Sequence, residues 1–392
     1  MSVGNIEKRG ENKYRLTVSD GFDGNGKRIK YRKTIAATSE REAKKQLAMF
    51  VSEVEKCQYV APSKFTFEEF SKKWIKDYAE QNLKTKTLQR YKDLLCYKII
   101  TEIGHLKLEQ IKPLHLVDFY TKLSTDGARL DEKSGGYSAK TIGHYHRLIH
   151  GMLEMATKWE MIPANPASKV HPPRVGRREI SFYDEEQSMR LIEELMNSPI
   201  KYKTSIILAI YTGMRREEIL GLEWQDINFN KQEIIIQRAS QYTPEKGIYT
   251  DNLKTSSSYR TISFPNNIAE LLTEYKAWQD EQKEKLGTLW TETGRIFTQE
   301  SGKPMHPDTF SGWFSKFIKA KGLPKVTFHG LRHTNASILI ANGVDLKTVS
   351  SRLGHASVQI TTDTYTHLIR KVERAAGNKM EEILNKNKIS ID

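Results

Sequence analysis

The chain is poor in cysteine, and it has no hydrophobic run of membrane-spanning length. Its two cysteines, Cys57 and Cys96, have neither the spacing of a metal site nor that of a disulfide framework. The longest apolar runs, such as SIILAIY, are far shorter than the roughly 20 residues that a membrane-spanning helix needs. The first residues are polar, unlike a signal peptide. We therefore expect a cytoplasmic protein with reduced thiols, no bound metal and no membrane partner.

Acidic residues are too few to balance the basic ones. The 62 Lys and Arg residues exceed the 48 Asp and Glu residues, which gives a net charge of +14. A solvated surface needs no such excess, so a polyanion is the expected partner. No basic amphipathic helix with a strong apolar face stands out, so nucleic acid is favoured over a membrane surface. The length of 392 residues predicts two or three domains.

The first sixty residues predict a small β-sheet covered by a helix. YRLTVSD alternates apolar and polar residues, a DGNG turn follows, and KRIKYRKTI forms the second strand. Arg28, Lys30 and Arg32 share one face of that strand and are candidate DNA contacts, because a β-ribbon fits the major groove. A plain solvated strand face explains the pattern equally well. Ser39 and Glu42 then predict a capping box at the start of the helix.

The remaining residues divide into a helical region and a mixed region. Helical patterns run without a strand pattern up to about residue 170, and NPASKVHPPRVGRR then reads as a basic linker. Further on, KYKTSIILAIYTGMRREEILGLEW reads as helix, and QEIIIQR and SYRTISFP read as strands. The predicted fold class is multidomain α+β. Its parts are an N-terminal sheet-plus-helix domain (1–60), an all-α bundle (63–170), a linker (171–178) and a mainly α domain with a small antiparallel sheet (179–392).

The mixed region contains the residue types that a metal-free phosphoryl transfer needs. They are Arg215 in TGMRREEI, Lys254 in LKTSSSYRTI, His329 and Arg332 in HGLRHT, His355 in LGHAS and Tyr365 in TYTH. A phosphodiester is anionic, and the planar fork of arginine binds two of its oxygens at once. Each motif alone is better explained as a surface pair, a helix cap or a packing ring. Their joint occurrence in this order points to one active site.

Together these motifs resemble the catalytic domain of the tyrosine recombinases, the phage integrase family. The helical region resembles the core-binding, SAM-like domain of that family. The N-terminal region resembles the AP2-like arm-binding domain in integrases of phages and conjugative transposons. The resemblance therefore implies a site-specific recombinase of a bacterial cell that integrates and excises a mobile element. It would cut and rejoin DNA through a Holliday junction.

The resemblance also implies a role for each residue of the motifs. Tyr365 would attack the scissile phosphorus and form a 3′-phosphotyrosyl link, and Lys254 would protonate the departing 5′-oxygen. Because the tyrosyl ester keeps the bond energy for rejoining, no cofactor is expected, and no GxxxxGK[ST] motif is present. The arginines would clamp the phosphate, His329 would assist proton transfer and His355 would donate a hydrogen bond to the phosphate. Glu218 would support the site, a role close to that of a plain salt bridge with Arg215.

The implied partners are double-stranded DNA at core-type and arm-type sites, a homotetramer on DNA, an excisionase and a DNA-bending host protein. The apolar spacing in RKVERAAGNKMEEILNKNKISID predicts a C-terminal helix, which would pack on its own domain or be donated to a neighbouring protomer. Two other functions stay open. One is a topoisomerase of type IB, which would cut with little sequence preference. The other is a DNA-binding protein without catalysis, which would not require the six residues together.

Overall fold

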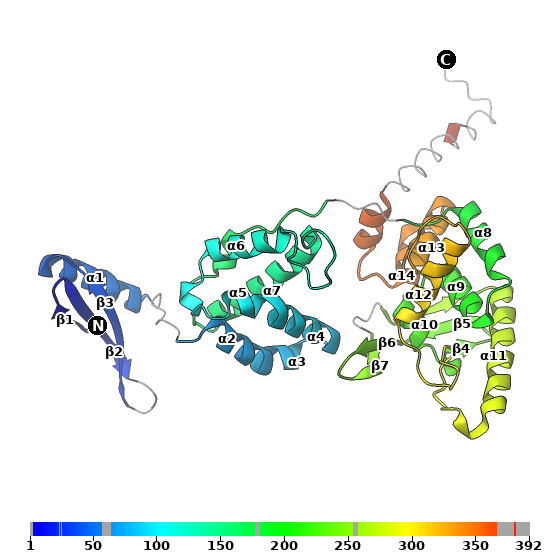
Figure 1. Cartoon of the computed structure of the whole chain (residues 1–392), viewed down its shortest axis with the longest axis horizontal. Helices are drawn as coiled ribbons and strands as arrows, with labels where there is room; N and C mark the ends of the chain where they lie inside the picture. The colour runs from blue at the N-terminus through cyan, green and yellow to red at the C-terminus, as the bar shows by residue number, and fades with distance from the viewer. Residues whose placement is uncertain are drawn as a thin grey trace, which may run out of the picture. The chain divides into compact units, whose positions relative to one another are not determined.

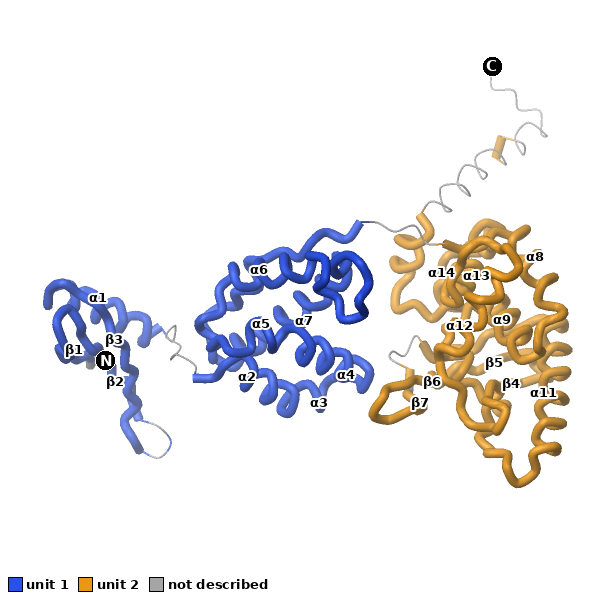
Figure 2. Tube along the Cα trace, in the orientation of Figure 1, with its two compact units in different colours: residues 1–177 blue, residues 178–392 orange. Residues whose placement is uncertain are grey.

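The computed structural model describes residues 3–22, 24, 26–56, 64–176, 181–253, 258–366 and 380–381. The chain separates into two compact units, residues 1–177 and 178–392 (Figure 2). The predicted α+β class is confirmed, since helices dominate and the sheets are small and antiparallel. Lys254 and nearly all of the predicted C-terminal helix lie outside the described residues. Within the described ranges, no helix combines the length and the apolarity needed to cross a membrane.

The first unit begins with a three-stranded antiparallel sheet in the order β1-β2-β3. Its strands are β1 (Val3–Gly10), β2 (Lys13–Phe22) and β3 (Arg28–Ala36). Helix α1 (Glu40–Glu55) lies along one face of the sheet (Figure 1). Strand β1 was not predicted from the sequence, because VGNIEKRG has only one large apolar side chain near its centre and two flanking glycines.

Helix α1 begins at Ser39, whose hydroxyl accepts a 3.2 Å hydrogen bond from the Glu42 amide. The second bond of the predicted capping box is not formed. The Glu42 carboxylate instead accepts hydrogen bonds of 2.8 Å from the amide and the hydroxyl of Thr38. The prediction of the helix start was therefore right, and that of the reciprocal bond was wrong. Leu16 and Val18 on the helix-facing side of β2 are fully buried.

Residues 64–176 form a bundle of helices around their own apolar core. The helices are α2 (Phe67–Trp74), α3 (Glu80–Asn82), α4 (Thr85–Leu94), α5 (Ile100–Ile103), α6 (Pro113–Ser124) and α7 (Ala139–Lys158). Single π-helical turns join α2 to α3 and α4 to α5. The predicted capping box of α2 is present between Thr66 and Glu69. Its aromatic residues Phe67, Phe70 and Trp74 are buried, so they serve the core.

The second unit is built around helix α9, which is apolar on nearly all sides and therefore central. The neighbours α11, α12 and α13 pack against it (Figure 1). The helices are α8 (Glu185–Leu195), α9 (Ile200–Thr212), α10 (Arg216–Gly221), α11 (Asn266–Leu286), α12 (Asp308–Ala320), α13 (Gly330–Ala341) and α14 (Leu346–Leu353). Residues 358–366 are also helical.

Two small antiparallel sheets complete this unit. The first pairs β4 (Ile227–Asn228), β5 (Glu233–Ile236) and β8 (Arg260–Ser263), so both predicted strands are found in it. The second is a hairpin of β6 (Arg238–Thr243) and β7 (Gly247–Asn252). This hairpin was not predicted, because RASQYT and GIYTDN are mostly polar and do not alternate clearly. Lys254 lies between β7 and β8 in the sequence.

Candidate active site

A glycine turn places Arg215 at the edge of the site. Helix α9 ends at Gly213, which has a φ of 65°, and Arg215 then becomes the N-cap of α10. The stretch that reads as one helix in the sequence is therefore two. A Cβ atom on Gly213 would lie 2.6 Å from a methyl group of Leu353 and 2.7 Å from Oδ1 of Asn335. Only glycine combines this backbone conformation with such close packing.

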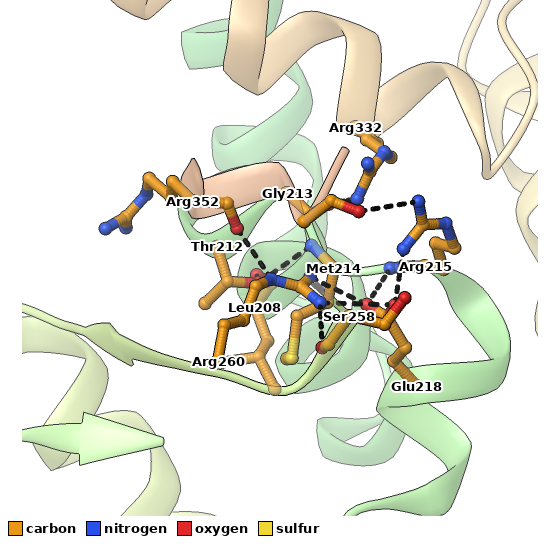
Figure 3. A network of polar contacts seen from close by, with 11 residues as sticks. Leu208, Thr212, Gly213, Met214, Arg215, Glu218, Ser258, Arg260, Arg332 and Arg352 are labelled. Atoms are coloured by element: carbon orange, nitrogen blue, oxygen red, sulfur yellow. Dashed lines mark hydrogen bonds and ion pairs between the residues drawn. The ribbon is translucent and has the colours of Figure 1, made fainter. Parts of the chain in front are cut away.

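A buried carboxylate, that of Glu218, holds two arginines (Figure 3). Arg215 donates to it from Nη1 at 2.7 Å and from its backbone amide at 2.9 Å. Arg260 on β8 donates from Nη2 at 2.8 Å and from Nη1 at 3.3 Å. The Glu218 side chain is only 2% exposed, and burial alone would raise its pKa. The hydrogen bonds and charges of Arg260 and Arg215 outweigh burial and lower this pKa, so the carboxylate stays ionised.

The same arginines also join three segments that are distant in the sequence. Arg260 Nε donates to the carbonyl of Arg352 at 2.7 Å, and Arg260 Nη1 donates to that of Ser258 at 3.1 Å. Arg215 Nη2 donates to the carbonyl of Gly354 at 3.3 Å. The start of α10, strand β8 and the end of α14 are therefore connected through these arginines to one carboxylate, that of Glu218.

Arg332 on α13 is buried, with 3% of its surface exposed, and it has one unused donor. Its Nη1 donates to the carbonyl of Gly213 at 2.8 Å, whereas its Nη2 is buried without a partner. Burial and then the charge of Arg215 lower the pKa of Arg332 to about 9. The group stays cationic at neutral pH. A bound phosphate oxygen would accept from Nη2 and would also offset the crowded positive charge.

Two predicted histidines flank these arginines. His329 is the N-cap of α13 and is exposed to solvent. His355 directly follows Gly354, which ends α14 with a φ of 67°, as the glycine in LGHAS predicts. His355 Nδ1 lies 2.8 Å from Oγ1 of Thr361. Burial and then the charge of Arg332 lower the pKa of His355 to about 4, so it is a neutral hydrogen-bonding group at pH 7.

Tyr365 lies near the end of the helical residues 358–366 and is 1% exposed. Its hydroxyl lies 2.7 Å from Nδ1 of His333. Burial raises the pKa of Tyr365, and the charge of Arg332 offsets only part of this rise. In the absence of DNA the phenol is therefore protonated, held by a histidine and shielded from water.

The structure brings five of the six predicted catalytic residues into one electrostatic neighbourhood. The charge of Arg215 acts on the pKa of Arg332, that of Arg332 acts on Tyr365, and both arginines act on the two histidines. The five residues are Arg215, His329, Arg332, His355 and Tyr365. The predicted DNA contacts of β3 belong to the other unit. No group of three His, Cys, Asp or Glu side chains in the described part of the chain is placed to hold a metal ion.

Arg260 and His333 contribute to this site but were not identified from the sequence. Both lie inside motifs that the sequence offered, SYRTI and HGLRHT. Arg260 is one of 62 basic residues, and no spacing rule relates it to Glu218, which lies 42 positions earlier. His333 directly follows Arg332, and adjacent residues on a helix do not face the same way. Only the fold brings these side chains to Glu218 and to Tyr365.

Replacing Arg260 with methionine should destabilise the second unit and slow DNA cleavage. Removing one partner of a buried ion pair costs about 3–5 kcal/mol, although Arg215 would still compensate Glu218 in part. We therefore expect a loss near the lower end, measured by urea unfolding. DNA cleavage should fall more than DNA affinity, because Arg215 loses its anchored partner, and Arg260→Lys should recover part of the rate.

A matched control is Arg238→Met. Arg238 forms ion pairs of 2.7 Å with Glu223 and 2.8 Å with Asp226, outside the Glu218 network. It should reduce stability without lowering the cleavage rate of the folded protein. An equal loss of cleavage in both variants would mean that Arg260 acts on stability alone.

Comparison with known proteins assigns both parts of this architecture to one family. Residues 181–371 match the phage integrase family, and residues 66–124 match the N-terminal SAM-like domain of phage integrases. A XerC-like tyrosine recombinase of Caldanaerobacter subterraneus is 29% identical, and the match covers 97% of this chain and 98% of that protein. The ICEBs1 integrase of Bacillus subtilis is 26% identical, with 98% and 100% covered.

Solved structures share the fold. The Tn1549 transposon integrase in complex with a circular intermediate DNA superimposes with a TM-score of 0.67 and 20% identity, over 81% of this chain and 100% of that one. A lambda integrase tetramer bound to a Holliday junction gives a TM-score of 0.53 and 18% identity, with 90% and 96% covered. With the catalytic and SAM-like domains both matched, this chain belongs to the phage integrase family of tyrosine recombinases.

Proposed function

We propose that this chain integrates and excises a mobile genetic element by site-specific recombination, with Tyr365 as the nucleophile. The observation that carries the proposal is the unpaired Nη2 of Arg332, buried beside the charge of Arg215 and the hydroxyl of Tyr365. An unsatisfied buried donor is costly, and a phosphate oxygen removes that cost. The ICEBs1 and Tn1549 integrases among the similar proteins support a mobile element as the substrate.

In this proposal the phosphate binds first to the two arginines. Arg332 and Arg215 take the non-bridging oxygens, and His355 donates its N–H to the same phosphate. Because these groups are held in place before the reaction, they stabilise the charge of the transition state without reorganising. Tyr365 then attacks the phosphorus in line with the departing 5′-oxygen.

The leaving oxygen needs a proton, and we assign that proton to Lys254. Lys254 is outside the described residues; in the sequence it precedes Ser258, whose carbonyl accepts a hydrogen bond from Arg260. The resemblance of LKTSSSYRTI to the family motif carries this assignment. Proton donation by a positioned group contributes about 10²–10⁴-fold.

Covalent trapping tests the proposal directly. Purified protein is incubated in excess EDTA with DNA from its own genomic neighbourhood and stopped with detergent, and the protein-linked 3′ ends are sequenced. We expect adducts at one or two defined sites with the native chain and none with Tyr365→Phe, which loses only the hydroxyl. The variant should bind the same DNA with unchanged affinity.

The same experiment separates the alternatives. Adducts scattered over unrelated DNA would favour a topoisomerase of type IB. Tight binding without any adduct would leave a DNA-binding protein in which Tyr365 is a packing residue.

We further propose that the N-terminal sheet binds arm-type DNA sites with its open face. Arg28, Lys30 and Arg32 are exposed on the face opposite α1. Lys30 and Arg32 pair with Ser19 and Thr17 of β2, so small polar side chains accompany them on that face. Such a face combines cations for phosphates with short hydrogen-bonding groups for base edges.

Replacing Arg28, Lys30 and Arg32 with alanine should weaken binding to arm-type DNA and leave core-site cleavage intact. Each phosphate contact contributes about 0.9 to the slope of log K against log salt, so the slope should fall by up to about 3. Titrations at several salt concentrations measure this. The matched control is alanine at Arg41, Lys44 and Lys45, exposed on α1, with the same loss of charge. An equal loss in the control would mean that net charge alone attracts DNA.

The proposed assembly is a homotetramer on DNA, and excision is proposed to involve an excisionase and a DNA-bending host protein. The lambda integrase tetramer on a Holliday junction supports the tetramer. The apolar periodicity of the C-terminal residues predicts a helix, and the family resemblance implies that it is given to a neighbouring protomer.

Deleting residues 379–392 should then impair recombination of two sites much more than binding to one site. Parallel recombination and mobility-shift assays compare the two losses. If both activities fall together, the segment packs on its own domain instead.

A further inference from the structure

His333 is in direct contact with the nucleophile, and the proposed mechanism gives it no role. Its Nδ1 lies 2.7 Å from the hydroxyl oxygen of Tyr365. It lies on α13 between Arg332 and the buried Thr334. The ring of His329, to which the family resemblance assigns proton transfer, lies 5.2 Å from the His333 ring. Among the described residues, His333 is the histidine hydrogen-bonded to Tyr365.

The direction of this hydrogen bond depends on the two protonation states and on the tautomer of the imidazole. Burial, and then the charges of His329 and Arg332, lower the pKa of His333 to about 4, so its ring is neutral at pH 7. Burial raises the pKa of Tyr365, so its hydroxyl is protonated. A neutral imidazole has one ring nitrogen free to accept. With its proton on Nε2, His333 accepts the phenolic hydrogen at Nδ1.

A hydrogen bond between tyrosine and histidine is not by itself a catalytic feature. In the helical bundle the hydroxyl of Tyr120 lies 3.0 Å from Nδ1 of His146; there the charge of Arg147 acts on the histidine, while burial alone raises the pKa of the tyrosine. The pair in the second unit differs because the charge of Arg332 acts on both His333 and Tyr365. A phosphate bound to Arg332 would therefore lie near the Tyr365 oxygen, which attacks the phosphorus. It would also lie near His333, which holds the hydrogen of that hydroxyl.

We infer that His333 is the catalytic residue that receives the proton of Tyr365 during strand cleavage; this rests on the proposed function. The hydroxyl proton moves to Nδ1 of His333 while the oxygen forms its bond to phosphorus. The bond from phosphorus to the 5′-oxygen breaks, and that oxygen keeps the electron pair and takes a proton from Lys254. In rejoining, the imidazolium of His333 returns its proton to the tyrosyl oxygen.

We expect phosphate binding to favour proton transfer to His333. Positive charge on Arg332 opposes a proton on His333 in the free protein. A phosphodiester carries a negative charge, and when it binds Arg332 it offsets that repulsion and favours the imidazolium. The same negative charge disfavours a free phenolate, since the charge of Arg332 lowers the pKa of Tyr365, so the proton moves to His333 as the bond from oxygen to phosphorus forms.

The test measures single-turnover cleavage of a nicked DNA substrate that traps the tyrosyl intermediate. His333→Asn keeps a polar group near the Nδ1 position but cannot accept a proton. We expect cleavage about 10²-fold slower or more, the usual range for a general base. A fluorinated tyrosine at position 365 is more acidic and needs less help, so it should restore at least about tenfold of the loss. The effect of the same fluorinated tyrosine in the native background is the reference.

His329→Asn is the matched variant, one helical turn away. It should slow cleavage without recovery by the fluorinated tyrosine, because His329 does not hold the phenol. Recovery in His329→Asn instead of His333→Asn would overturn the inference, as would a slow His333→Asn that the fluorinated tyrosine does not improve.

Controls separate folding and the proposed function from the role of His333. Thermal unfolding and DNA binding verify that each variant is folded. If His333→Asn does not fold, His333→Gln serves, and the same recovery is expected. A native chain that forms no tyrosyl adduct would refute the proposed function and this inference together. Normal adducts with an unaffected His333→Asn would refute the inference alone.

Discussion

The active site depends on one buried carboxylate, that of Glu218. A site that binds a phosphodiester through its side chains must bring cations together, and those cations repel each other before the phosphate binds. Glu218 accepts hydrogen bonds from Arg215 and Arg260 and lowers the cost of that arrangement. It does not neutralise the site, because Arg332 keeps a lowered pKa and an unpaired donor. A bound phosphate would offset the positive charge that remains and accept from the unpaired donor.

The C-terminal ends of two helices also hold the arginines in place. Arg332 donates to the carbonyl of Gly213 at the end of α9, and Arg215 donates to that of Gly354 at the end of α14. Helix C-termini carry partial negative charge and unpaired carbonyls, so they attract guanidinium groups. Both helices stop at a glycine with positive φ, which turns the chain away and leaves the last carbonyls accessible. Gly213 and Gly354 therefore make carbonyl groups available to the guanidinium groups of Arg332 and Arg215.

The sequence predicted the parts of this molecule that follow short-range rules. The half-buried strand β2, the capping box at Thr66, the glycine stop at Gly354 and the ion pair of Arg215 with Glu218 all depend on residues at most four positions apart. Order and spacing also grouped five catalytic candidates that the fold brings together. Strand β1 and the β6–β7 hairpin were missed because polar strands have no clear period. Arg260 and His333 were missed because their partners lie 42 and 32 positions away.

In the proposed mechanism, phosphate binding changes the protonation states of the free site. His333 and His355 are neutral at pH 7, and Tyr365 keeps its proton. Burial moves each pKa further from pH 7, and the arginine charges add to this effect at the histidines. A bound phosphate would offset the arginine charge that lowers the pKa values of the two histidines, without exposing the site to water. In the proposed mechanism a bound phosphate therefore favours a protonated His333 but disfavours a free phenolate, because the charge of Arg332 lowers the pKa of Tyr365. The proton is then expected to leave the phenol only as its oxygen forms the bond to phosphorus.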